Sequence, residues 1–322
     1  KKIVEAIPPS LVAAIAVGIG LFITFIGLKN LGVVVKDPIT FVSAGPITAT
    51  VLIGLLGLLV MIFFEMKKIS GGLVIGILAS TVLAIIFDKN IKMPQQFISL
   101  NLNIQAIAFH LDIINALKWS FLGTIFTLTF IDMFDSIGTL VACCHQANMV
   151  DEKGKIKGLE KLLSIDAVAT VLGALLGTST VTSYIESAAG IEQGGRSGLT
   201  SIVTGILFLL ALLFVPIVRI VPSYATAPAL IMVGLFMMKE VKKIDFNNLE
   251  EAFPAFIIMI MIALSYSIST GLAFGFISFA AIKIVSGQAR KIKSVMWVIA
   301  ILSILFLTVD WLPKLINYLS NL

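Results

Sequence analysis

The chain of 322 residues is 58% hydrophobic and only 13% charged, and its mean hydropathy is +1.07. A soluble domain carries about 25% charged residues, so this composition excludes a soluble globular protein, and the large apolar content excludes disorder. The two cysteines are adjacent, which excludes a disulfide-rich secreted scaffold. The composition therefore indicates a polytopic membrane protein, whose net charge of +5 reflects basic cytoplasmic loops, and we expect no nucleic-acid partner.

Apolar runs separated by short polar stretches follow one another along the whole chain. Only continuous helices or closed barrels can face lipid, and these runs lack the two-residue alternation of barrel strands. The sequence therefore predicts membrane helices. The runs cover residues 9–28, 46–64, 71–87, 117–141, 162–177, 198–218, 225–238, 252–266, 269–286 and 294–312.

The distribution of basic residues predicts an orientation. If the N-terminus is cytoplasmic and the polar stretch 178–197 counts as one further crossing, 16 of the 23 basic residues lie inside and 7 outside. This bias is typical of membrane proteins. The stretch 88–116 is then an extracellular loop with an amphipathic segment. The last run, 294–312, crosses the membrane or lies in the interface, because Asp310 and Pro313 make its end ambiguous.

Two acidic residues lie inside the run 117–141. Asp132 and Asp135 are three residues apart, and Thr139 follows one turn later, so all three share one helix face. A carboxylate in a membrane helix is costly, and no basic residue lies nearby in this run to pair with either acid. We therefore predict a substrate or proton site, in which one of the two acids carries a proton because neighbouring carboxylates do not both ionise readily. Hydrogen bonds to neighbouring helices are the structural alternative.

The residues 178–183 are rich in hydroxyl groups and β-branched side chains, which is too polar for a helix facing lipid. The pattern predicts an extended segment buried in protein or lining a cavity, followed by a half-helix that begins near Ser183 or Tyr184. Broken helices of this kind form substrate sites at the membrane midplane. Glu186 is then in the first turn and faces the site. A solvated external loop is the alternative.

At these positions the sequence resembles a known family. The motifs FDSIGTL at 134–140 and GTSTVTSYIESAAG at 177–190 resemble those of the AzgA-like purine permeases, a branch of the nucleobase–ascorbate transporter superfamily. The start of the chain, with IP at 7–8 and GIGLFI at 18–23, resembles the family's fifth segment, and ATAPAL at 225–230 resembles its twelfth.

The resemblance implies a fold. The family is an all-α polytopic membrane protein of fourteen segments in two inverted seven-helix repeats, with core and gate domains and a short midplane strand. On this register the chain holds segments five to fourteen, without the N-terminal half of the core. The implied parts are gate helices of the first repeat at 1–90, the extracellular loop at 91–116, core helices with the substrate site at 117–220, and gate helices of the second repeat with a C-terminal segment at 221–322.

The resemblance also implies a function, the import of a purine nucleobase (adenine, guanine, hypoxanthine or xanthine) across the cell membrane by proton symport. Glu186 matches the family's substrate glutamate, Asp135 the acid of its eighth helix, and Asp132 the further acid of the purine branch. Asp132 and Asp135 are the expected proton-coupling residues. The complete expected substrate site is Glu186, Asp135, Asp132, Thr139, Ser183, Tyr184 and Thr182.

The implied partners are the purine, protons and the lipid bilayer, and homodimers are common in the superfamily. No cofactor, metal site or enzymatic activity is expected, because the chain lacks nucleotide-binding, metal-binding and nucleophile motifs. A transporter of the same fold for uracil or for an organic or inorganic anion is the main alternative. The acids at the site disfavour an anion because they repel it. A channel or a receptor is a further alternative.

Overall fold

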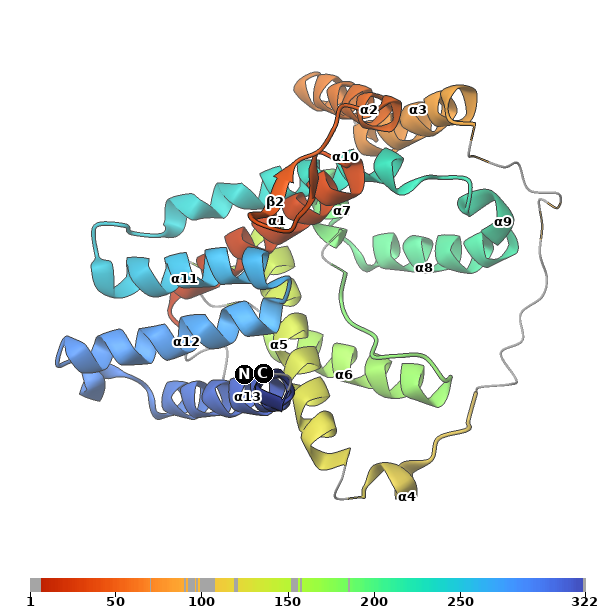
Figure 1. Cartoon of the computed structure of the whole chain (residues 1–322). Helices are drawn as coiled ribbons and strands as arrows, with labels where there is room; N and C mark the ends of the chain where they lie inside the picture. Colours follow the sequence, from red (N-terminus) through yellow and green to blue (C-terminus); the bar gives the residue numbers. More distant parts are fainter. Residues whose placement is uncertain are drawn as a thin grey trace. The chain divides into compact units, whose positions relative to one another are not determined.

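The computed structural model describes residues 7–69, 71–89, 91, 96, 98, 108–118, 121–151, 156, 158–184 and 186–320 (Figure 1). Each of the ten apolar runs forms a helix, so the prediction of a helical membrane protein is confirmed. The helices that correspond to these runs are α1 (Pro9–Leu31), α2 (Ala49–Met66), α3 (Gly72–Phe87), α5 (Leu122–Gln146), α6 (Leu159–Leu175), α8 (Gly198–Leu213), α10 (Ser223–Met237), α11 (Leu249–Ser265), α12 (Ile268–Val285) and α13 (Ser294–Ser320).

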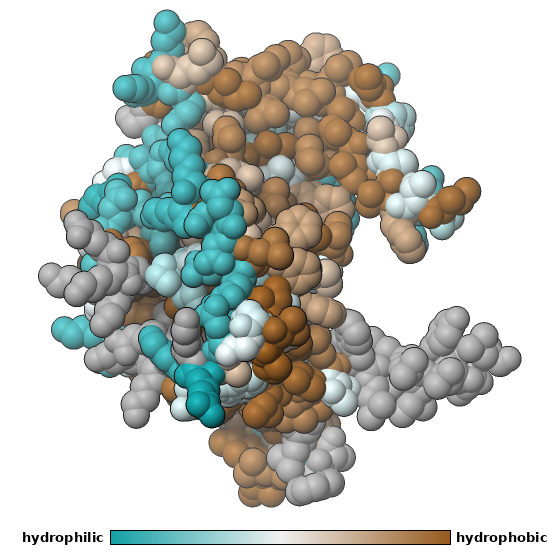
Figure 2. Space-filling view, turned by 90° about the vertical axis from the view of Figure 1, so that its left-hand side faces the viewer, coloured by the Kyte–Doolittle hydropathy of each residue, from teal (hydrophilic) through white to brown (hydrophobic). Residues whose placement is uncertain are grey.

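Four described helical segments are long and apolar enough to span a membrane. They are Pro9–Leu31, Ala49–Met66, Ser223–Lys243 and Ile268–Val285, and three shorter apolar helices accompany them. Large hydrophobic side chains are exposed along many helices, and Figure 2 shows broad apolar areas beside a separate area of polar side chains. This separation is expected of a protein whose apolar surface faces lipid.

The chain forms two compact units. The first contains residues 1–21, 104–187 and 237–322. Its helices α11, α12 and α13 lie side by side, and α5 crosses them (Figure 1). The beginning of α1 is buried among them, because Leu11 to Val17 are almost fully enclosed. A helix that is apolar on every side belongs in such an interior.

A buried polar contact holds the last turn of α5 within the first unit. His145 Nδ1 lies 2.6 Å from Glu240 Oε2, and Lys243 Nζ lies 2.8 Å from the same oxygen. Glu240 and Lys243 belong to the 3₁₀ helix η4 (Met238–Lys243), which precedes α11. His145 is buried, so this contact attaches the end of α5 to η4 in a site largely closed to solvent.

The second unit contains residues 22–103 and 188–236. Its α2 and α3 form a close pair, and Met61 and Leu73 from this pair pack with Met232 and Phe236 of α10. The helix α8 has no buried residue, and its apolar side chains are exposed on all sides. The short helices α7 (Ser187–Glu192) and α9 (Val215–Val218) flank α8 in sequence.

The only sheet among the described residues is a hairpin that the sequence analysis missed. Strand β1 (Val34–Asp37) pairs antiparallel with β2 (Phe41–Ala44), and Val34 lies opposite Ala44. Asp37 closes the turn, because its Oδ1 accepts hydrogen bonds from the backbone N–H groups of Ile39 and Thr40, each at 2.8 Å. Phe41, the first residue of β2, takes the left-handed conformation at φ 66°, which glycine adopts more readily than other residues.

The predicted break in the helices at 178–183 is present, but these residues do not form the short midplane strand that the resemblance implied. Residues 178–184 are described, and they have no regular secondary structure and no ladder partner. A lone extended segment cannot form a ladder, because its backbone groups need a neighbouring strand. Most of the predicted loop 91–116 lies outside the described residues, apart from residues 91, 96, 98 and 108–116, which include the one-turn helix α4 (Ile113–Ala116).

Two further details refine the predicted boundaries. The run 198–218 is divided into α8 and α9, and Pro216 lies in the first turn of α9, where proline fits because the missing N–H has no partner there. The last helix, α13, continues past Asp310 and Pro313 to Ser320. The partition of the chain into gate and core segments stays a prediction.

Candidate functional site in the first unit

The predicted acidic face of α5 is present, and Asp135 has a definite partner. The Ser269 hydroxyl donates a hydrogen bond of 2.8 Å to Asp135 Oδ1, and the backbone N–H of Ser269 also donates to this carboxylate. Ser269 is the second residue of α12 and is fully buried. Asp135 therefore binds the N-terminal end of α12, where unpaired N–H groups and the helix dipole favour an anion.

The turn between α11 and α12 directs this helix end toward α5. Tyr266 adopts the left-handed conformation with φ 58°, which reverses the chain within a single residue. Ser267 then caps α12, because its side chain accepts a hydrogen bond from the backbone N–H of Thr270 at 3.2 Å. The Ser265 hydroxyl donates to the carbonyl oxygen of Ser267 at 3.1 Å. These local bonds fix the start of α12 in front of Asp135.

Gly138 allows the close approach of these helices. A Cβ atom on Gly138 would lie 3.3 Å from Ile268 Cγ2 and within 3.5 Å of side-chain atoms of Ile15 and Ile19. The residue is one turn from Asp135, on the face that meets α12 and α1. The contact between Asp135 and α12 is therefore part of a tightly packed helix junction.

Asp132 has a different environment one turn earlier. The Thr180 hydroxyl donates a hydrogen bond to its carboxylate, and the charge of Asp166, from α6, lies close enough to repel it. Asp132 Oδ1 is buried and has no hydrogen-bond partner among the residues that the structure describes. A buried unpaired carboxylate oxygen is unfavourable, and protonation or a bound ligand can relieve it.

The run 178–183 lies along α6 in the opposite direction. The Thr170 hydroxyl donates to the carbonyl oxygen of Val181 at 2.9 Å, and the Ser183 hydroxyl donates to Asp166 Oδ1 at 3.4 Å. A Cβ atom on Gly173 would lie 2.8 Å from Thr178 Oγ1. Glycine at this position therefore lets the run approach α6 closely.

Asp166 is a site residue that the sequence analysis missed. It is half-buried on α6 and acts on Asp132 while accepting from Ser183. The signal was available, because Asp166 is an acid inside the apolar run 162–177, which is the criterion that identified Asp132 and Asp135. The structure thus brings two acids, Asp132 and Asp166, to the run 178–183.

Glu186 lies near Cys143, in a later part of α5 than the part that contains Asp135. It is exposed and comes just before α7, which begins at Ser187, so its predicted place in the first turn of a helix from Ser183 or Tyr184 is wrong. Its charge acts on Cys143, and Cys143 Sγ lies 4.0 Å from the carbonyl oxygen of Tyr184. Cys143 is eight residues from Asp135, which is about 12 Å along the helix axis.

The remaining predicted residues differ in what they can contact. The Thr139 hydroxyl is committed to its own helix, because it donates to the carbonyl oxygens of Asp135 at 2.9 Å and Ser136 at 3.2 Å. Thr182 is half-buried, and the Tyr184 side chain is 71% exposed. The side chains of Thr182 and Tyr184 are therefore available to a ligand, whereas the hydroxyl of Thr139 is not.

The functional groups of this site determine what it can bind. The described residues contain no cluster of three or more histidine, cysteine, aspartate or glutamate side chains that could hold a metal ion. The site offers carboxylates, hydroxyl groups and an unwound backbone between α6 and α7. Such groups bind a neutral polar molecule by hydrogen bonds, and the carboxylates can also take up protons.

Comparison with known proteins identifies the family. A family described as a permease family matches residues 1–274. The chain belongs to this permease family. It is 40% identical to a guanine/hypoxanthine permease of Bacillus subtilis over 95% of this chain and 70% of that protein. It is 37% identical to an adenine permease of Escherichia coli over 93% of this chain and 67% of that protein. A candidate permease of Methanocaldococcus jannaschii shares 42% identity over 94% of this chain and 69% of its own length.

Membership of the permease family confirms the resemblance to the purine permeases that the motifs at 134–140 and 177–190 indicated. It also agrees with the expectation that the protein is not an enzyme, since these relatives are named as permeases. The chain is a multi-pass membrane protein with helices long enough to span the bilayer.

Proposed function

We propose that this permease is a secondary active transporter that imports a purine nucleobase (adenine, guanine, hypoxanthine or xanthine) across the cell membrane by proton symport, with its N-terminus in the cytoplasm. The names of the relatives, which are adenine and guanine/hypoxanthine permeases, support the substrate class. The observation that carries the proposal is the pairing of an unwound segment with membrane carboxylates. The run 178–183 interrupts the helices between α6 and α7 and contacts both Asp132 and Asp166.

The purine is bound by residues of the segment 182–186 in the first unit. A purine edge carries ring N–H donors and ring nitrogen acceptors, so a carboxylate can accept from it while hydroxyl groups and backbone amides donate to it. Glu186 supplies the carboxylate, and Thr182, Ser183 and Tyr184 lie in the segment just before it. Cys143, which Glu186 lies near, is eight positions along α5 from Asp135, so Glu186 is the main substrate ligand and Asp135 lies deeper in the protein.

The protons are carried by the acids of α5. Asp132 has a buried unpaired oxygen and lies near Asp166, so a shared or bound proton relieves both the missing hydrogen bond and the repulsion. Asp135 lies one turn away and contributes a second charge on the same face. Protonation of these acids together with purine binding gives the coupling that symport requires.

The substrate class is tested by uptake in cells that lack their own purine permeases. We expect uptake of a radiolabelled purine that is inhibited by other purines and not by uracil or sulfate. Uptake of uracil or of an anion in place of purines would favour the alternative transporters and contradict the proposal.

The role of Glu186 is tested by Glu186→Gln, which keeps the shape and replaces one acceptor oxygen by a donor. Loss of a hydrogen bond to a charged group costs about 1.5–3 kcal/mol, so we expect about 10-fold to 100-fold weaker purine binding. Glu192→Gln, at the other end of the adjacent short helix α7, is the matched control and should retain affinity. Equal affinity in the wild type and Glu186→Gln would remove Glu186 from the site.

Proton coupling is tested by the pH dependence of uptake. Symport requires a bound proton, so wild-type uptake should fall as the external pH rises and should stop when a protonophore removes the gradient. Asp132→Asn should lose this dependence if Asp132 carries the proton. Wild-type uptake that is insensitive to both pH and protonophore would contradict proton symport while leaving the purine assignment intact.

A further inference from the structure

The contact between Asp135 and the start of α12 joins residues that are 134 positions apart in the chain. Asp135 receives two hydrogen bonds there, one from the Ser269 hydroxyl at 2.8 Å and one from the Ser269 backbone N–H. Ser269 is 0% exposed, so water does not compete for its hydroxyl. The carboxylate therefore has fixed donors that its neighbour Asp132 lacks at Oδ1.

Donors of this kind act on the ionisation of a carboxyl group. A hydrogen bond from an O–H or N–H stabilises the carboxylate more than the neutral acid, and the N-terminal end of a helix adds to this preference. We propose that Ser269 is a positioning residue for Asp135, which it holds as an ionised carboxylate against the N-terminal end of α12. This proposal rests on the proposed transport function, because Asp135 is one of the two acids proposed to carry the proton of the symport, and Ser269 sets the pH at which Asp135 takes up that proton.

The charged groups around Asp135 are consistent with this assignment. Of the described residues, Asp132 is the charged side chain that acts on Asp135. On the packed elements, Asp166 of α6 acts on Asp132, and Lys283 lies in the last turn of α12 and binds Glu250. The part of α1 in this unit has no titratable residue, and the side chains of Asp310 and Lys314 of α13 lie outside the described set. Ser269 and its backbone N–H are therefore the groups that oppose the repulsion from Asp132.

The packing of the junction shows that the contact is specific. Ile268, the residue before Ser269, lies against Gly138 of α5, and a Cβ atom on Gly138 would be only 3.3 Å from its side chain, so Ile268 would have to shift slightly. Ser267 caps α12 through its bond to the N–H of Thr270, so it is engaged at the helix end and Ser269 is left to bind Asp135. These neighbours hold the hydroxyl of Ser269 in place without contributing charge.

The test is Ser269→Ala, compared with Ser303→Ala. Ser303 is equally buried in the same unit, but its hydroxyl donates to Ile299 within its own helix, so the two variants differ in whether a carboxylate loses a donor. The readout is the pH of half-maximal purine uptake. Removing the donor favours the protonated acid, so Ser269→Ala should move this midpoint upward by about one pH unit, whereas Ser303→Ala should leave it unchanged.

A double-mutant cycle that combines Ser269→Ala with Asp135→Asn distinguishes a positioning role of Ser269 from a general structural effect. In the Asp135→Asn background, Ser269→Ala should cause no further shift of the midpoint, because the titrating group is gone. Ser269→Cys, which keeps the size and donates weakly, should give an intermediate shift and replaces Ser269→Ala if that variant does not fold. An unchanged midpoint in both Ser269 variants, or equal shifts with and without Asp135, would overturn the proposal.

A direct titration distinguishes this proposal from the proposed function. Infrared difference spectra of the purified protein report the carboxyl band that disappears in Asp135→Asn, and this band requires no transport. We expect it to titrate at higher pH in Ser269→Ala than in the wild type. A protein that does not transport purines but shows this shift contradicts the proposed function alone, and a purine transporter without the shift contradicts the role of Ser269 alone.

Discussion

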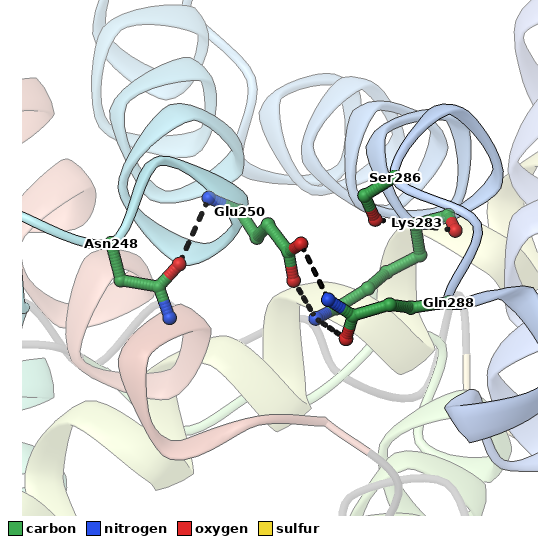
Figure 3. Close-up of polar contacts among 5 residues, drawn as sticks. All are labelled: Asn248, Glu250, Lys283, Ser286 and Gln288. Atoms are coloured by element: carbon green, nitrogen blue, oxygen red, sulfur yellow. Dashed lines mark hydrogen bonds and ion pairs between the residues drawn. The ribbon is translucent and has the colours of Figure 1, made fainter.

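The two ends of the α11–α12 pair are held together in different ways. At the end near Asp135 the two backbones meet closely, because a Cβ atom on Gly271 would lie 2.5 Å from the backbone nitrogen of Ile262. At the opposite end, long polar side chains bridge the helices, and Figure 3 shows the carboxylate of Glu250 in α11 in contact with the ends of Lys283 and Gln288. Lys283 and Glu250 are 15% and 24% exposed in their side chains.

The end with the close backbone contact should tolerate substitutions less well than the end with the polar side chains. The backbone contact at Gly271 has no freedom, since a backbone atom cannot move aside as the end of a side chain can. The polar bridge consists of flexible side chains, and Asn248 caps α11 beside it by accepting from the N–H of Glu250 at 3.2 Å (Figure 3). The rigid end is also the end that presents Ser269 to Asp135, so rigidity and the candidate site coincide.

Gly271→Ala should produce the largest effect. The new methyl group would meet the backbone and the side chain of Ile262, so α11 and α12 would have to separate, at about 1–3 kcal/mol. Thermal unfolding of the purified protein in detergent measures the loss. Gly205→Ala in α8 is the control, because no atom lies within 4 Å of the new methyl group, and this variant should be neutral or slightly more stable. Equal melting temperatures for the two variants would contradict the close backbone contact.

Asp135→Ala should have the next largest effect on stability. It leaves the fully buried Ser269 hydroxyl without its acceptor, which costs about 1–3 kcal/mol. Asp132→Ala is the matched control, because it removes a carboxylate with one unpaired oxygen and should cost less or even stabilise the protein. The same thermal unfolding measurement applies. A larger loss for Asp132→Ala than for Asp135→Ala would reverse the roles that the contacts give to the two acids.

Glu250→Gln tests the polar end and should have a smaller effect. The pair with Lys283 is partly exposed, so its loss should lower stability by about 0.5–1 kcal/mol. The difference from the wild type should shrink at high salt because ions screen exposed charges. Glu251→Gln changes the same charge in the same first turn of α11 and controls for the helix dipole. A salt-independent loss, or an equal loss in Glu251→Gln, would show that the ion pair contributes little.

The sequence predicted the helices and part of the site because both depend on local patterns. The lengths of the apolar runs identify the membrane helices, and the spacing of Asp132 and Asp135 places them on one face. The same criterion would have identified Asp166, which was overlooked. Ser269 could not be predicted as the partner of Asp135, because the fold brings together residues that are 134 positions apart.

The hairpin β1–β2 was missed for a different reason. Val33 to Lys36, the Asp37–Pro38 turn and Phe41–Val42 form a recognisable short hairpin pattern, but this pattern is much shorter than the apolar runs on either side of it. The start of the half-helix was predicted three to four residues too early, because Ser183 is a suitable cap residue, whereas its hydroxyl instead binds Asp166. Tertiary hydrogen bonds therefore influence where the half-helix starts, which the local sequence pattern does not predict.

A substitution at Asp37, in the β1–β2 hairpin of the second unit, should have the smallest effect on the protein. The backbone N–H of Thr40, then that of Ile39 and the Thr40 hydroxyl, lower the pKa of Asp37 below its ordinary value. A lowered pKa in the folded hairpin means that the carboxylate stabilises the turn at pH values above its ordinary pKa, and that this contribution is lost as the pH falls through the lowered value. Hydrogen exchange of residues 33–45, corrected for intrinsic exchange rates, should show protection that decreases over this acidic range. Asp37→Ala should show weaker protection at neutral pH and no acid-dependent decrease. The same decrease in both proteins would assign it to another group, since the carboxylate at position 37 would then not be the titrating acceptor of the turn.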